Sequence, residues 1–288
     1  MKLKKIFLFP CFCLLLSLLV SIKATACELD SCGKSGPHPS LEVACQQVRK
    51  LYQKKFPDQE VECNLKGSTE MCDVDGDEAT CKPIPNSATI NLGAEGTLLK
   101  AGYFSLGFNP QLFLMAFQNE KGWKIVGEIF DHYNPGAGGV TSMFRIDKFE
   151  AVQLIPNGPK EVLFSYRLFG HDTDMGINRV TEWEDQYLHV CGMDNDTAYC
   201  SQRIPIKLRQ IRKMLFATEE AELCKGKDKF CDPLHRLEVQ SNRKWNPDAG
   251  TVTLQFKYKL SSIKLSRELE ELIRNLTGTR PILSLPRL

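Results

Sequence analysis

The stretch Leu112-Phe113-Leu114-Met115-Ala116-Phe117-Gln118 decides the fold, because almost every residue in it is apolar. Successive side chains of a β-strand point to opposite faces, so the odd and even positions here give two apolar faces. A strand of this kind is typical of the centre of a sheet that is covered on both sides. Residues 119–122 then form a turn, and residues 123–130 predict a returning antiparallel strand.

Further short apolar and aromatic runs extend this pattern in both directions along the chain. Strands are predicted at 97–107, 143–155, 161–169, 180–190, 202–212, 237–243 and 251–260. Short connections favour antiparallel neighbours, and Asn246-Pro247-Asp248-Ala249-Gly250 is a strong hairpin signal. In the last strand Thr253, Gln255 and Lys257 alternate with apolar residues, which predicts one solvated face. We therefore expect a mainly β protein, an antiparallel meander folded as a sandwich, a barrel or a propeller-like sheet.

Two helices are expected outside these strands, one in a Cys-rich N-terminal lead and a short one near the C-terminus. Ser40 can cap the first helix, whose apolar positions recur at helical spacing until Phe56-Pro57. The second runs from Ser266 to Asn275 and should stop at Gly278. The expected organisation is a signal peptide at 1–26, a Cys-rich helical lead at 27–85, an antiparallel β domain at 86–260, and a helix with a tail at 261–288.

The first 26 residues have the three parts of a cleavable export signal. Lysines open it, an apolar run covers residues 6–22, and Ala24-Thr25-Ala26 supplies small residues for cleavage. Because the run is shorter than the roughly 20 residues that span a bilayer, we expect cleavage near Ala26 and a secreted or periplasmic protein. A lipid on Cys27 is the alternative, which would make the protein a membrane-anchored lipoprotein.

The net charge of the expected mature chain is close to zero. The precursor has 37 basic and 35 acidic residues. The leader contains four of the basic residues and no acidic one, which leaves 33 basic against 35 acidic residues and a net charge of −2. A near-neutral surface gives no reason to expect nucleic acid as a partner.

Ten of the twelve cysteines remain once the leader is removed, and an even number suits an oxidising compartment. Connectivity cannot be deduced from a sequence, but the spacing suggests short local closures. The suggested pairs are Cys27–Cys32, Cys45–Cys63, Cys72–Cys81, Cys191–Cys200 and Cys224–Cys231. Zinc is the alternative, but structural zinc sites usually use two closely spaced cysteine pairs, and only Cys27 and Cys32 approach that spacing.

Two long polar loops, 131–142 and 170–179, are expected at one edge of the sheet if consecutive strands are antiparallel. Functional groups concentrate on loops that a rigid scaffold holds in place. The residues that could converge there on a metal or a polar ligand are Asp131, His132, Tyr133, His171, Asp172 and Asp174. Aspartate, asparagine and glycine are also ordinary loop residues, so plain turn chemistry is the competing explanation.

Asp73, Asp75 and Asp77 alternate in the way that calcium ligands do. A helix–loop–helix calcium site would also need a glycine where Glu78 stands and a glutamate where Ile84 stands. An acidic loop closed by a disulfide explains the segment without a metal. No cofactor is therefore expected, and calcium is the alternative.

Glu182 and Glu184 share one face of a predicted strand, while Trp183 points to the other. Paired carboxylates can serve glycoside hydrolysis, but a solvated face opposite a buried tryptophan explains the pattern more simply. A serine or cysteine nucleophile needs a base and an orienting group beside it, and no motif in the sequence selects such a set. No residue is therefore assigned a catalytic role.

Together these features favour an exported, disulfide-stabilised protein with a non-catalytic role in binding or as an envelope accessory. Its partner would be a protein or a glycan, and contact with a membrane is expected only if Cys27 is lipidated. The alternative function is that of a metal-assisted hydrolase, which would use the histidines and aspartates of loops 131–142 and 170–179.

Overall fold

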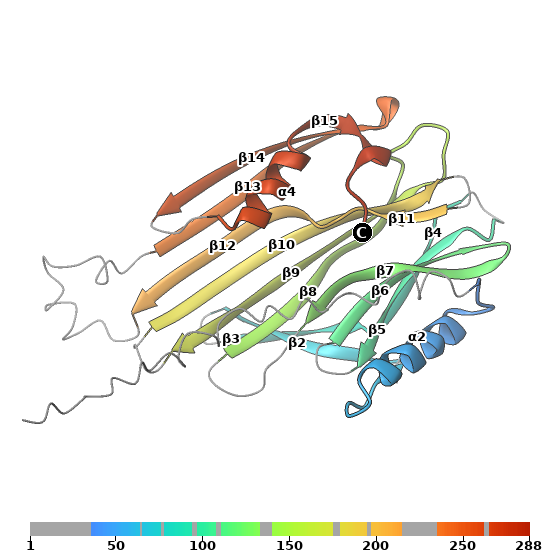
Figure 1. Cartoon of the computed structure of the whole chain (residues 1–288), viewed down its shortest axis with the longest axis horizontal. Coiled ribbons are helices and arrows are strands. Elements are labelled where there is room, and N and C mark those ends of the chain that lie inside the picture. Colours follow the sequence, from blue (N-terminus) through green and yellow to red (C-terminus); the bar gives the residue numbers. More distant parts are fainter. Residues whose placement is uncertain are drawn as a thin grey trace, which may run out of the picture.

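The computed structural model describes residues 36–63, 65–75, 78–93, 97–107, 111–132, 140–174, 179–194, 197–214, 235–261 and 265–288. Within these ranges only the backbone is described for residues 69–82, 131–132, 140–142, 172–174, 179–180, 212–214, 235–236 and 261. The described chain forms two antiparallel sheets, a separate hairpin and two α-helices, so the expected mainly β fold is confirmed (Figure 1).

One sheet, here called the small sheet, has its hydrogen-bonded strands in the order β1-β5-β6-β7, and β4 also pairs with β5. Its strands are β1 (Glu62–Cys63), β4 (Ser87–Asn91), β5 (Lys100–Gly107), β6 (Gln111–Asn119) and β7 (Gly122–His132). The central position predicted for the apolar stretch is confirmed, since β6 lies between β5 and β7 and its residues 112–117 are all buried.

The N-terminal helix α2 (Leu41–Lys55) covers one face of the small sheet. It begins where predicted, because the Ser40 hydroxyl accepts a hydrogen bond from the Val43 N–H at 3.2 Å. The helix buries Ala44, Cys45 and Val48 against the even-numbered side chains of β6. The chain is also fixed just before the helix, where the backbones of His38 and Trp123 exchange two hydrogen bonds of 2.7 Å.

The second sheet, here called the large sheet, has the strand order β15-β14-β13-β12-β10-β9-β8, with β11 paired to β10. Its strands are β8 (Val140–Val152), β9 (Glu161–Asp174), β10 (Arg179–Asp194), β11 (Thr197–Cys200), β12 (Ile204–Met214), β13 (His235–Asn246), β14 (Thr251–Ser261) and β15 (Gly278–Pro281). The short 3-10 helix η1 (Pro247–Ala249) turns β13 into β14, at the site of the predicted hairpin.

The two sheets pack face to face through an aromatic core. Phe113 of β6 stacks on Phe130 of β7 with ring centroids 4.4 Å apart, and Phe130 stacks on Tyr166 of β9 at 4.2 Å. Phe144 of β8 meets Phe113 edge to face at 4.8 Å. The fold is therefore a sandwich over the β8–β10 half of the large sheet, while Figure 1 shows the β12–β15 half extending beyond the small sheet.

The C-terminal helix α4 (Arg267–Leu276) lies over the other half of the large sheet. The Ser266 hydroxyl accepts from the Leu269 N–H at 3.2 Å, which caps the helix one residue from its predicted start. Ile273 packs with Leu208 of β12 and Val239 of β13 in a separate buried cluster, here called the α4 cluster. The chain then turns at Gly278, adds β15 to the rim, and continues through the 3-10 helix η2 (Ile282–Ser284).

Three features of the chain differ from the sequence expectations. Strands β7 and β8, expected as antiparallel neighbours, belong to different sheets. The segment 191–200, which separates the predicted strands 180–190 and 202–212, continues β10 and contains β11, which pairs with it. The N-terminal lead also contains β structure, since β2 (Ser68–Asp75) and β3 (Glu78–Pro85) form a two-stranded hairpin. Within the described ranges, no helix has the length and apolarity needed to cross a bilayer.

Candidate functional site

The residues expected on two polar loops lie instead largely on strands. Asp131 and His132 end β7 in the small sheet, where they pair with Leu112 and Gln111. His171, Asp172 and Asp174 belong to β9 in the large sheet, so the expected loop 170–179 is shorter than predicted. The expected loop 131–142 is shorter too, because β8 already begins at Val140.

The structure tests only part of the expected His/Asp cluster. His171 is exposed, and its backbone is paired with Thr141 on one side and Glu182 on the other. The side chains of Asp131, His132, Asp172 and Asp174, and the whole of Tyr133, lie outside what is described. Convergence of these groups on a ligand stays a prediction.

The acidic segment proposed as a calcium site falls on the β2–β3 hairpin. Asp73 and Asp75 are strand residues of β2, and Asp77 lies outside the described residues. Cys72 and Cys81 are directly opposite each other in this hairpin, which suits the suggested pairing, although their side chains are not described. Among the residues that the structure describes, no group of three or more His, Cys, Asp or Glu side chains could hold a metal ion.

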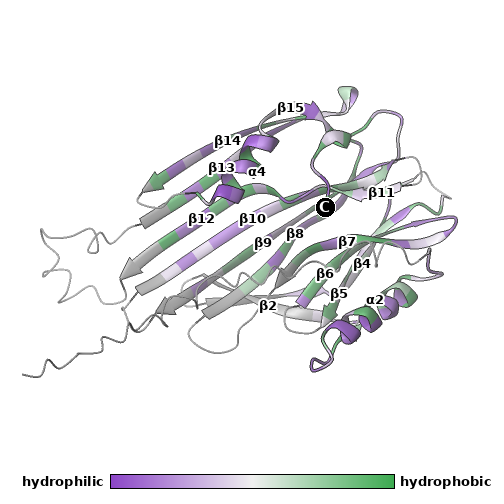
Figure 2. Cartoon of the chain, in the orientation of Figure 1, coloured by the Kyte–Doolittle hydropathy of each residue, from purple (hydrophilic) through white to green (hydrophobic). Residues whose placement is uncertain are grey.

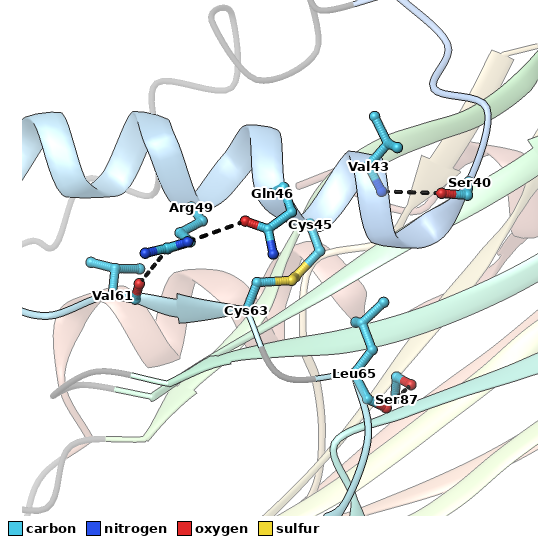
Figure 3. The surroundings of a disulfide bond; sticks show 9 residues. All are labelled: Ser40, Val43, Cys45, Gln46, Arg49, Val61, Cys63, Leu65 and Ser87. Carbon is cyan, nitrogen blue, oxygen red and sulfur yellow. Dashed lines mark hydrogen bonds between the residues drawn. A yellow bond between two sulfur atoms is a disulfide. The ribbon is translucent and has the colours of Figure 1, made fainter.

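Two of the five suggested disulfides are present in the described chain. Cys45–Cys63 joins α2 to β1, and Cys191–Cys200 joins the paired strands β10 and β11. Cys27, Cys32, Cys224 and Cys231 lie outside the described residues. Figure 3 shows that Cys45 faces the strand segment from the inner side of α2, beside Arg49, whose Nε donates to the Val61 carbonyl at 2.8 Å.

A row of alternating charges crosses four neighbouring strands of the large sheet, and we call it the charge ladder. Its members are Arg145 and Asp147 of β8, Arg167 of β9, Glu184 of β10 and Lys207 of β12. The distances between successive charged atoms are 2.9 Å for Arg145–Asp147, 3.5 Å for Asp147–Arg167, 3.1 Å for Arg167–Glu184 and 2.7 Å for Glu184–Lys207. Each carboxylate therefore bridges two cations.

The backbone explains why Asp147 reaches both arginines. Arg145 and Arg167 are directly opposite each other on β8 and β9, a placement that is unfavourable for like charges. The register between these strands shifts immediately after Ile146, and Asp147 is the extra residue. A bulge of this kind redirects a side chain, and here the carboxylate contacts both guanidinium groups as well as Gln186, whose Nε2 donates to it at 2.8 Å.

Glu184 is the second bridging carboxylate of the charge ladder, and its side chain is 21% exposed. Partial burial would raise its pKa, but the Lys207 hydrogen bond and the positive charges of Lys207, Arg167 and Arg209 lower the pKa below its ordinary value. The expectation of a solvated face is therefore only partly met, because Glu184 is held in ion pairs. Trp183, expected to be buried, is half-buried.

The opposite side of β10 carries a polar row made of Asp185, Tyr187 and His189, which alternate along the strand and so share one face. The Tyr187 hydroxyl donates to Asp185 Oδ2 at 3.3 Å. The guanidinium of Arg203 lies over the Tyr187 ring, 5.5 Å from its centroid. Tyr187 packs against both the aromatic core and the α4 cluster. The polar row therefore lies where the aromatic core and the α4 cluster adjoin.

Burial changes the protonation of both ends of the polar row. It raises the pKa of the Asp185 carboxyl to about 6, although Tyr187 and Arg203 act in the opposite direction. It lowers the pKa of the His189 imidazole to about 4, against the effect of its hydrogen bond with Ser201. His189 is only 1% exposed. It is therefore a neutral, enclosed imidazole at physiological pH, hydrogen-bonded to the backbone of Ser201.

The alternation of the polar row can be seen in the sequence, but its burial cannot, because part of the cover over Tyr187 comes from α4, some eighty residues further along the chain. Comparisons with known proteins add no constraint: no family model, no curated protein and no solved structure matches this chain.

Proposed function

We propose that this chain is an exported protein that binds a protein or glycan partner in the periplasm or outside the cell. The main support for export is the pair of disulfides within the hydrophobic clusters. Cys45, Cys191 and Cys200 are at most 2% exposed, so these sulfurs belong to the packed interior. Disulfides of this kind persist in oxidising compartments, and the leader-like residues 1–26 supply a route to one.

The binding half rests on the form of the large sheet. Strands β9, β10, β12, β13 and β14 are each 11 to 16 residues long, which gives a wide and regular platform. One side of β13 and β14 is exposed and polar, and it carries Gln240, Asn242, Lys244, Gln255 and Lys257. Scaffolds of this kind support recognition of large partners, because rigid strands hold many side chains in a fixed pattern.

Export is tested by expressing the full chain in a bacterial host beside a control that lacks residues 1–26. The intact mass of the envelope fraction is then measured before and after reduction and alkylation. We expect a chain that starts at Cys27 and whose cysteines react with the alkylating reagent only after reduction. A full-length chain in the cytosol with freely reactive cysteines would overturn the proposal, whereas an added lipid mass on Cys27 would place the exported protein on a membrane.

The same protein also tests the metal-assisted hydrolase. Zinc is titrated into the metal-free exported protein and into the variant His171→Ala. Stoichiometric zinc binding that depends on His171 would favour the hydrolase over the binding role. Under the binding proposal the two proteins take up zinc equally weakly.

A further inference from the structure

Strand β14 has an outer edge that is only partly covered. On its inner side all residues from Thr251 to Ser261 pair with β13. On its outer side β15 pairs with Thr251–Leu254 alone. Within the part of the chain that the structure describes, no strand pairs with the outer edge of Gln255–Ser261, and Figure 1 shows this half of β14 at the rim of the large sheet. We call these seven residues the free edge.

The free edge presents apolar side chains on one face of the sheet. Tyr258 is 60% exposed and Leu260 is 40% exposed, and they are among the few large apolar side chains that the described chain leaves in solvent. Phe256, on the same face, instead packs against the α4 cluster. The apolar side chains of β14 thus continue beyond the part of the strand that the α4 cluster covers (Figure 2).

The other face of the free edge is cationic. Lys257 and Lys259 are exposed and point to the same side, as alternation along a strand requires. Across the sheet Lys259 is opposite Glu238, whereas Lys257 is opposite the neutral Gln240. Two lysines two residues apart therefore give this edge a positive charge along one side.

Lysines on an edge strand commonly prevent edge-to-edge association of identical chains. In a symmetric antiparallel pairing centred on Tyr258, Lys257 of one copy would face Lys259 of the other, and directly opposed like charges are destabilising. The same two lysines would attract carboxylates at these positions. The charge pattern disfavours a second copy and favours an acidic strand.

We propose that the free edge of β14 binds an extended segment of a partner protein in which acidic residues alternate with apolar ones. The segment adds a strand to the large sheet, and its backbone pairs with the outward N–H and C=O groups of Gln255–Ser261. Its carboxylates lie beside Lys257 and Lys259, and its apolar side chains cover Tyr258 and Leu260. This inference rests on the binding role proposed above and is independent of export.

The test uses the purified exported protein and a fluorescein-labelled peptide that alternates glutamate and valine over the length of the free edge. Fluorescence anisotropy is measured at low and high salt. A peptide with lysine in place of glutamate tests charge, and a glutamate–valine peptide with N-methyl groups along one backbone edge tests strand pairing. We expect saturable binding of the acidic peptide that weakens with salt, and a loss of about tenfold or more in affinity on N-methylation.

The variant Lys257→Glu/Lys259→Glu should weaken the acidic peptide by about tenfold and gain affinity for the lysine peptide. Lys121→Glu/Lys124→Glu, which makes the same charge change at the exposed turn between β6 and β7, should leave both affinities nearly unchanged. Equal binding of the N-methylated and unmodified peptides, or no saturable binding, would overturn the inference. A dimer that Lys257→Glu/Lys259→Glu alters would show that a second copy occupies the edge. Export is measured separately by intact mass, so these binding results leave the proposal of export untouched.

Discussion

Tyr166 of β9 and His189 of β10 stack ring against ring, with centroids 5.9 Å apart and planes 13° from parallel. The imidazole Nδ1 lies 2.7 Å from the Ser201 carbonyl oxygen, so in the neutral ring Nδ1 carries the hydrogen and donates a hydrogen bond to that oxygen. The imidazole also interacts with the backbone of Ile129 in the small sheet. His189 thus sits where the two sheets meet, and its protonation is coupled to their packing.

The first prediction concerns the pH dependence that His189 imposes on stability. Burial lowers the pKa of His189 to about 4 in the folded protein. Between about pH 6.5 and 4 the imidazole is therefore neutral in the folded protein, whereas it takes up a proton in the unfolded chain. The contribution of His189 to the free energy of unfolding should therefore fall between about pH 6.5 and 4, and it is measured as the difference between the parent and a variant without the imidazole. His189→Asn, which keeps a donor near Ser201, should remove this fall in urea titrations across that range. The exposed His171→Asn is the control, and a fall of equal size in His189→Asn would contradict the assignment.

The second prediction concerns Asp185, whose contribution has the opposite sign. Its pKa is raised to about 6 in the folded protein, so the unfolded chain ionises first as the pH rises from about 4. Asp185 therefore reduces stability progressively between pH 4 and 6, and the effect persists above that range. The stability of Asp185→Asn relative to the parent should be higher at pH 7.5 than at pH 4, as measured by urea unfolding. A relative stability that is higher at pH 4 would refute the predicted sign.

The third prediction concerns the bridging carboxylate of the charge ladder. Asp147→Asn removes the carboxylate that pairs with both Arg145 and Arg167, and it leaves these two like charges directly opposite each other. Because Asp147 is only 14% exposed, we expect a loss of roughly 1–2 kcal/mol in the free energy of unfolding, reduced by high salt. Glu150→Gln breaks the exposed pair with Lys148 and should cost less than about 0.5 kcal/mol. Similar losses in the two variants would show that the bulge brings no special stabilisation.

The fourth prediction compares the two described disulfides. Replacing Cys45 and Cys63 by alanine frees α2 from β1, and replacing Cys191 and Cys200 opens a bridge between strands that remain hydrogen-bonded. Chain entropy alone assigns each bridge about 3 kcal/mol, slightly more for the longer Cys45–Cys63 loop. We expect both double variants to lower the thermal midpoint, with hydrogen exchange in α2 rising only when Cys45–Cys63 is lost. Equal exchange in α2 in both variants would show that packing alone holds the helix.

Much of the strand pattern could be predicted because local signals and tertiary packing agree. The alternating apolar residues of β6 specify a strand buried on both faces, and the structure buries both. Ser40 caps the first helix as the sequence suggests, and Ser266, expected as the first residue of the second helix, is the residue that caps it. Gly278 has a φ of +106°, a conformation that favours glycine, and the chain leaves the helix there.

The remaining features depend on contacts that no local pattern encodes. The step from β7 to β8 resembles an ordinary strand connection, so the sequence does not show that the two strands join different sheets. The acidic, cysteine-bearing β2–β3 hairpin lacks the apolar run by which strands are recognised. Asp185 and His189 are polar residues in a strand, and only the small sheet and α4 together make their surroundings apolar.

The two backbone hydrogen bonds between His38 and Trp123 fix where the N-terminal segment joins the fold. A side chain at Gly122 would lie 2.5 Å from the His38 carbonyl oxygen, so the N-terminal segment presses directly on the turn between β6 and β7. The residues between Cys27 and His38 span at most about 40 Å when fully extended. Figure 1 shows that turn at one end of the molecule and the last residues of β14 at the other. A lipid on Cys27 would thus attach the protein to a membrane through the end that carries the β6–β7 turn, and the rim of β14 lies at the opposite end of the molecule.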